Sequence, residues 1–249
     1  EAFSWSLVAE TMAKRRSSAG ISFEPDLALS DLTRPDYLFL LSPPRAQFAN
    51  AKAGFGALRA LARHGAVLGG VSGGVFPLVR SGVMAGHVVS VHWCYDAAFR
   101  SEFPEVQASD RVIEVASRRY TASGAAAAFD LSLRLIETRL GADVATEVAC
   151  WFQHPLMRGE GVQQSIPTYR SATTDATLPP VVAKAVTIFA AHLESPISVA
   201  EVADGVGVSP RQIERSFKKA TGQSPSHYYR ALRMKAAKQL VMYSKDGMA

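Results

Sequence analysis

The segment from residue 198 to residue 219 places two short helix signals on either side of a glycine-containing turn. Ser198 can cap a helix, and Glu201 three residues later completes a capping box. The first helix would bury Val199, Val202 and Ala203 and stop at Gly205-Val206-Gly207. The second helix signal is a serine cap, a first-turn proline and two apolar positions: Ser209, Pro210, Ile213 and Phe217. The segment therefore predicts a helix-turn-helix unit.

The second helix of this unit presents a polar, mostly basic face opposite its apolar one. Its members are Arg211, Gln212, Arg215, Lys218 and Lys219. The major groove of DNA admits one helix, and arginine or glutamine can form paired hydrogen bonds with base edges. The two lysines are better placed for phosphates. A helical hairpin with an ordinary solvated face is the alternative interpretation.

The charge of the chain is concentrated in the same region. The net charge is +5, and residues 178–249 hold 10 basic and 5 acidic side chains. Residues 1–177 hold 17 of each. A basic segment joined to a neutral one indicates that only the C-terminal part meets a polyanion.

Residues 180–243 resemble the AraC family of transcriptional regulators. The matching positions are 197–203, 208–212, 215–217, 221–225, Tyr229 and 233–240. The resemblance implies double-stranded DNA as partner and a DNA-binding set of Ser209, Arg211, Gln212, Glu214, Arg215 and Lys218, with Gln212 the weaker candidate. Family members carry two helix-turn-helix units, and the resemblance here ends after the helix that would connect them. We therefore expect this chain to hold the first unit only.

Residues before 160 alternate strand and helix signals. The predicted strands cover residues 3–9, 36–41, 66–71, 87–93, 111–116 and 119–122. The predicted helices cover residues 48–64, 75–81 and 125–141. This order predicts an α/β domain with a doubly wound, mostly parallel sheet at 1–160. A Ser-, Thr- and Pro-rich stretch predicts a linker at 161–179, and a small all-α domain follows at 180–249.

A G-x-S-x-G motif at residues 70–74 lies between a predicted strand and a predicted helix. This context is typical of a nucleophile elbow, with Ser72 at the turn and His92 as candidate base. Cys94 would share the face of His92 on a strand. A serine hydroxyl needs a base held by a third group, and none is visible. We therefore predict a degenerate, non-catalytic pocket, with a Ser72-dependent amidase or hydrolase as the alternative.

Residues 3–155 resemble the PfpI-like, class I glutamine amidotransferase-like domains, which have a flavodoxin-like fold. The resemblance rests on residues 70–74, 82–86, 90–93 and 120–130. It implies that the first strand and helix of the fold precede Glu1. Followed by an AraC-type domain, it implies a GlxA-type regulator, usually a homodimer, that senses a small nitrogenous metabolite such as arginine, betaine or carnitine. The expected ligand-binding set is Ser42, Ser72, Gly73, His92 and Trp93.

Several classes of protein are not expected from this sequence. No apolar run reaches the roughly 18 residues of a membrane span, and no secretory signal is recognisable. The two cysteines, Cys94 and Cys150, form no disulfide framework, which favours the cytoplasm. The six histidines show no metal-ligand spacing, so we expect no metal and no cofactor.

Overall fold

The computed structural model describes residues 2–17, 19–154, 158, 161–164 and 178–243. Two compact units make up the fold, one centred on residues 1–164 and one on residues 165–242. Each unit is described by itself. The domain boundaries expected from the sequence stay a prediction, because most of the predicted linker lies outside the described residues.

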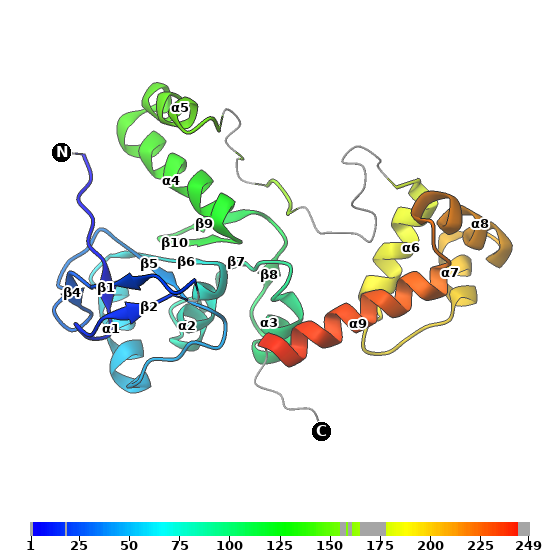
Figure 1. The fold of residues 1–249 in the computed structure, drawn as a ribbon, viewed down its shortest axis with the longest axis horizontal. Helices are drawn as coiled ribbons and strands as arrows, with labels where there is room; N and C mark the ends of the chain where they lie inside the picture. The colour runs from blue at the N-terminus through cyan, green and yellow to red at the C-terminus, as the bar shows by residue number, and fades with distance from the viewer. Residues whose placement is uncertain (1, 18, 155–157, 159–160, 165–177, 244–249) are drawn as a thin grey trace. The chain divides into compact units, whose positions relative to one another are not determined.

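A four-stranded sheet forms the centre of the N-terminal unit (Figure 1). Its strands, in spatial order, are β5 (Tyr37–Leu41), β6 (Val67–Val71), β10 (Arg119–Ala122) and β9 (Ile113–Ala116). The first three strands are parallel and β9 is antiparallel to β10. The sheet is therefore mostly parallel, as the sequence predicts.

Side chains of β5 alternate between two hydrophobic clusters, one on each face of the sheet. Leu38 and Leu40 contact the cluster built with α1 (Ala51–Arg63), α2 (Val75–Arg80) and α3 (Asp96–Glu102). Phe39 contacts the cluster that includes Ala127 and Leu131 of α4 (Ala125–Leu140). Helices on both faces confirm the predicted doubly wound α/β fold.

Two of the predicted strands are much shorter than expected. The segment 3–9 forms only β1 (Val8–Ala9), paired with β4 (Leu27–Ala28), and the Trp5 side chain is 85% exposed with no sheet to cover it. The segment 87–93 forms only β7 (Val89–Ser90), paired with β8 (Ala108–Ser109). It ends early because the Tyr95 amide donates to the His92 carbonyl, at 2.8 Å, and turns the chain into α3.

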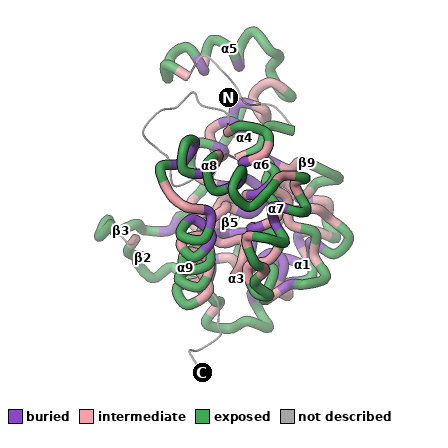
Figure 2. The backbone as a smooth tube through the Cα atoms, turned by 90° about the vertical axis from the view of Figure 1, so that its right-hand side faces the viewer, coloured by how far each residue is buried: buried purple, intermediate pink, exposed green. Residues whose placement is uncertain are grey.

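Several short elements were not predicted, among them α3, β4 and β8. A short hairpin joins β2 (Arg15–Arg16) to β3 (Ser22–Phe23). Helix α5 (Ala142–Trp151) packs on α4 through Ala145 and Ala149, and Figure 2 shows most of its remaining surface exposed. None of the described helices is long and apolar enough to cross a bilayer.

The C-terminal unit consists of helices in its described part. They are α6 (Pro180–Ala191), α7 (Val199–Val206), α8 (Pro210–Thr221) and α9 (Pro225–Tyr243). The predicted capping box of Ser198 and Glu201 is present, and the predicted cap Ser209 forms a second box with Gln212. Gly207 ends α7 in the left-handed conformation at φ 77°. The core is formed by fully buried side chains from each helix, among them Val182, Phe189, Val202, Ile213, Phe217 and Tyr228. Val199 is only partly buried, contrary to expectation, because it is the first residue of α7.

Candidate functional site

The start of α8 is held by a reciprocal pair of hydrogen bonds. The Gln212 amide donates to the Ser209 hydroxyl at 3.2 Å, and the Ser209 amide donates to Gln212 Oε1 at 3.1 Å. Both residues were predicted to contact DNA. The structure places them in the cap, so a base contact through Gln212 Oε1 would compete with the start of the helix.

Four other predicted DNA-binding residues lie together on the exposed face of α8. Arg211, Glu214, Arg215 and Lys218 are spaced at i, i+3, i+4 and i+7, which places them in one stripe along the helix. Ile213 and Phe217 are fully buried on the opposite face. The stripe carries three cations and one carboxylate, a composition that suits a helix lying in the major groove.

Aromatic contacts fix α8 to the rest of its unit. The Phe217 ring meets the Phe189 ring at 5.9 Å and the Tyr228 ring at 5.5 Å between centroids. Two further residues of the AraC-like motif bind the end of α6: the Tyr229 hydroxyl donates to the His192 carbonyl, and Arg233 donates to the Leu193 carbonyl at 3.0 Å. These two motif positions therefore support the helix arrangement rather than offering groups to DNA.

The second predicted site is the elbow that follows β6. Ser72 has a φ of 55°, a left-handed conformation that is uncommon for a residue with a side chain. It opens the short 3-10 helix η1 (Ser72–Gly74), which leads directly into α2. The structure thus has the sharp strand-to-helix turn predicted from the sequence.

The elbow packs tightly against the loop that follows β5. A Cβ atom at Gly73 would lie 2.3 Å from the Ser42 carbonyl oxygen, and one at Gly74 would lie 1.9 Å from that of Leu40. Only glycine fits at these positions. Ser42 and Gly73, both predicted ligand-site residues, are therefore neighbours. Within the described part of the chain, the buried Ser42 hydroxyl has no hydrogen-bond partner.

A largely buried arginine holds this loop in place. Arg80 of α2 donates to the Pro44 and Ala46 carbonyls, both at 2.9 Å. It also forms a two-point ion pair with Glu102 of α3, at 2.7 and 2.9 Å. Sequence reasoning missed Arg80 because its partners are 22 to 36 residues away.

His92 has the wrong hydrogen-bonding arrangement for a catalytic base. Its Nδ1 atom accepts a hydrogen bond from the Cys94 amide at 3.2 Å, so the neutral ring carries its proton on Nε2. Burial lowers the pKa of His92, which favours this neutral form. In the described part of the chain, neither Ser72 nor a carboxylate is hydrogen-bonded to the ring. Neither ring nitrogen is thus set up to take a proton from Ser72.

The turn after His92 differs from the predicted strand. Cys94 does not share a strand face with His92, because residues 92–95 form a turn and the Cys94 amide bonds to the His92 ring. The Trp93 ring lies 5.3 Å from the His92 ring, between centroids. Tyr95, which sequence reasoning missed, lies 5.6 Å from His92 between ring centroids. Burial raises the pKa of Tyr95, and the nearby Ser72 hydroxyl opposes that rise.

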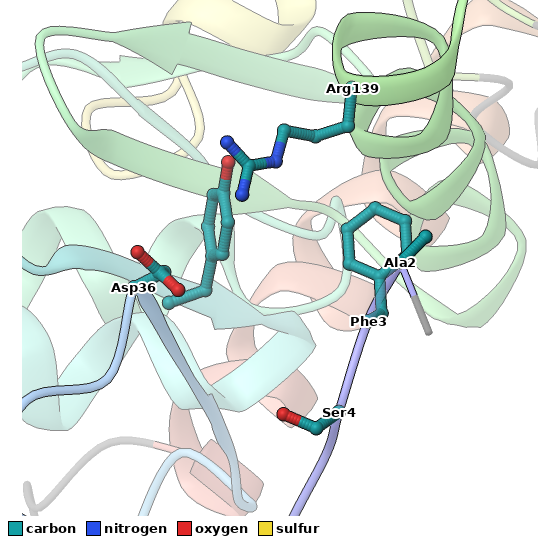
Figure 3. A pocket seen from close by; sticks show the side chains of 6 residues that line it. Ala2, Phe3, Ser4, Asp36 and Arg139 are labelled. Carbon is teal, nitrogen blue, oxygen red and sulfur yellow. The ribbon is translucent and has the colours of Figure 1, made fainter.

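Two hollows lie at the other end of the sheet. One, of about 230 Å³, is lined by Ala2, Phe3, Ser4, Asp36, Tyr37 and Arg139 (Figure 3). Another, of about 510 Å³, lies at the amino ends of β5, β6 and β10. In open parallel sheets ligands bind beyond the carboxyl ends of the strands, where Ser72 lies. We therefore assign the candidate ligand site to the elbow.

Comparisons with known proteins agree with both units. Residues 202–249 match the family described as a helix-turn-helix domain. The chain superposes on an AraC family transcriptional regulator from Pseudomonas putida with a TM-score of 0.52 and 22% identity, covering 58% of this chain and 78% of that one. It superposes on a DJ-1 superfamily protein from Salmonella typhimurium with a TM-score of 0.51 and 20% identity. This match covers 60% of this chain and 81% of that one. The chain thus joins a domain with the fold of DJ-1/PfpI-like proteins to a helix-turn-helix domain.

Two curated relatives are similar to most of this chain. The HTH-type transcriptional regulator ArgR of Pseudomonas aeruginosa is 34% identical over 192 residues, which are 77% of this chain and 57% of that protein. The HTH-type transcriptional regulator GbdR of Pseudomonas aeruginosa is 33% identical over 225 residues, 90% of this chain and 60% of that protein. The chain is similar in sequence to these regulators and spans less than two thirds of their length.

Proposed function

We propose that this chain is the sensing domain and first DNA-reading unit of a cytoplasmic transcriptional regulator. The observation that carries the proposal is the stripe of Arg211, Arg215 and Lys218 on a capped, firmly packed α8. The stripe lies in a segment that matches helix-turn-helix domains, and both curated relatives are named as transcriptional regulators. Two such chains would form a homodimer on operator DNA, as in many regulators of this kind.

The effector in this proposal binds at the elbow, against Ser42, Ser72, Gly73, His92 and Trp93. The orphaned Ser42 hydroxyl supports this placement, because buried polar groups are normally paired. Aromatic rings at Trp93 and Tyr95 suit a nitrogenous, cationic metabolite. Binding without chemistry is favoured over an amidase, since His92 offers Ser72 no hydrogen-bond acceptor.

The DNA-reading part is tested with two substitutions in α8. Arg215→Ala should weaken binding to a duplex selected by this chain from random DNA by on the order of 1–3 kcal/mol and relax preference at one base position. Lys218→Ala should weaken binding to all DNA sequences by the same factor. It should also lower, by about 1, the slope of the logarithm of the binding constant against the logarithm of the salt concentration. Fluorescence anisotropy over a range of salt concentrations measures both effects. Lys184→Ala on α6 is the charge-matched control, and unchanged binding by both α8 variants would disprove the assignment.

The environment of His92 predicts how stability depends on pH. Burial lowers the pKa of His92 below its unfolded value of 6.5, so the unfolded chain binds a proton that the folded chain resists. The contribution of His92 to the free energy of unfolding is fully present above pH 6.5 and is lost as the pH falls toward the folded pKa. Urea unfolding between pH 8 and pH 5 should therefore show that the free energy of unfolding falls more steeply for the native chain than for His92→Gln. Parallel curves for the two proteins would contradict the buried neutral state.

A further inference from the structure

The first residues of the predicted linker, 161–164, lie along the edge of the N-terminal unit. The Val112 amide donates to the Val162 carbonyl, and the Gln164 amide donates to the Asp110 carbonyl, both at 2.8 Å. Arg111 and Gln163 form an antiparallel bridge between these two bonds. Residues 162–164 therefore extend as a short strand-like segment beside residues 110–112.

The side chain of Gln164 reaches from this segment to the backbone around His92. Its Oε1 atom accepts a hydrogen bond from the Trp93 amide at 3.0 Å. Its Nε2 atom donates to the Val91 carbonyl at 2.8 Å and to the Arg111 carbonyl at 3.2 Å. The amide thus bonds to the residues immediately before and after His92, as the peptide group of a neighbouring parallel strand would do.

This contact continues the hydrogen bonding beyond the end of β7. The strand stops at Ser90, and the Val91 amide still donates to the Ser109 carbonyl of β8, at 3.3 Å. The side-chain amide of Gln164 supplies the acceptor for the Trp93 amide and the donor for the Val91 carbonyl. The orientation of His92 and Trp93, both in the candidate ligand site, thus depends on a residue at the beginning of the predicted linker.

We propose that Gln164 couples the elbow site to the segment that leads to the helix-turn-helix domain. A ligand that displaces the His92–Trp93 backbone would lengthen the Gln164 hydrogen bonds and loosen residues 162–164. Conversely, a change in that segment would alter the ligand site, because coupling between two sites is reciprocal. This inference rests on the proposed sensing role of the elbow, and it makes Gln164 a positioning residue rather than a ligand-binding one.

The coupling can be measured by hydrogen–deuterium exchange resolved to single amides in the full chain. Gln164→Met keeps the length of the side chain and removes its hydrogen bonds. Exchange of the Trp93 amide should rise about three- to tenfold, the value expected for the loss of one hydrogen bond. Gln163→Met, at the exposed neighbouring position, is the matched control and should leave this amide unchanged. Amides of β6 that keep their native protection show that the variant is folded. If Gln164→Met does not fold, Gln164→Asn replaces it in the same measurement.

A double-mutant cycle tests whether Gln164 transmits a change at the elbow to residues 162–164, or only stabilises the backbone around His92. His92→Ala, which perturbs the elbow site without any effector, should speed exchange of the Val112 amide that bonds to Val162. In the Gln164→Met background, His92→Ala should have no further effect on Val112. Unchanged Trp93 exchange in Gln164→Met, or an undiminished effect of His92→Ala in the double variant, would overturn the proposal. The exchange measurement uses no DNA. The coupling proposal can therefore be disproved while the Arg215 test supports DNA binding, and DNA binding can be disproved while the coupling holds.

Discussion

Replacing Arg80 by methionine is expected to lower the free energy of unfolding of the N-terminal unit by about 3–5 kcal/mol. Arg80 and Glu102 are only 10% and 17% exposed, so the pair is largely shielded from water. Methionine fills part of the space but removes the cation from a buried carboxylate. It also leaves the Pro44 and Ala46 carbonyls without their arginine hydrogen bonds.

A second arginine provides the matched control for this substitution. Arg100 pairs with Asp96 within α3, but both side chains are well exposed, at 58% and 42%. Arg100→Met should therefore cost only about 0.3–0.5 kcal/mol. Urea denaturation of both variants, followed by circular dichroism, gives the comparison. Equal losses for the two variants would show that burial of the Arg80 pair contributes nothing, and the loop beside the elbow would then have another anchor.

Truncation of Phe217 to alanine should have an effect of the same size on the C-terminal unit. Phe217 is fully buried and meets two other rings, so removing it leaves a cavity costing about 3–5 kcal/mol. The hydrophobic clusters of the two units share no residues, so the C-terminal unit should unfold earlier while the N-terminal transition stays in place. Differential scanning calorimetry would show the separation, together with loss of DNA binding.

The control for this truncation is another residue of the C-terminal unit. Met234 of α9 is 65% exposed, and Met234→Ala should change stability by less than about 0.5 kcal/mol. If Phe217→Ala and Met234→Ala behaved alike, the assigned core of the helix-turn-helix unit would be wrong.

The helix-turn-helix unit was predictable because its signals are local. Ser198 with Glu201, and Ser209 with Gln212, are caps whose partners lie three residues away, and the structure contains both. The sheet was predictable for a similar reason, since apolar runs such as 36–41 and 66–71 suit strands that are buried on both faces. In these elements, local preference and tertiary packing favour the same conformation.

The remaining features depend on contacts between distant parts of the chain. The strand expected at 87–93 stops at Ser90 because a turn at His92 starts α3, a helix without a strong periodic signal. Gln164 reaches the residues beside His92 across more than 70 positions, and no spacing rule indicates such a pair. The geometry around the elbow is therefore a tertiary property, although the elbow itself is a local motif.

The close fit between the elbow and the loop after β5 restricts how this domain can diversify. Gly73 and Gly74 lie against the Ser42 and Leu40 carbonyls with no room for a side chain, so the floor of the site is backbone on both sides. Substitution of Gly73 or Gly74 would therefore disrupt the turn. Under the proposed sensing role, a change of effector would therefore arise at the surrounding side chains, such as Trp93 and Tyr95, where substitution leaves the backbone of the turn intact.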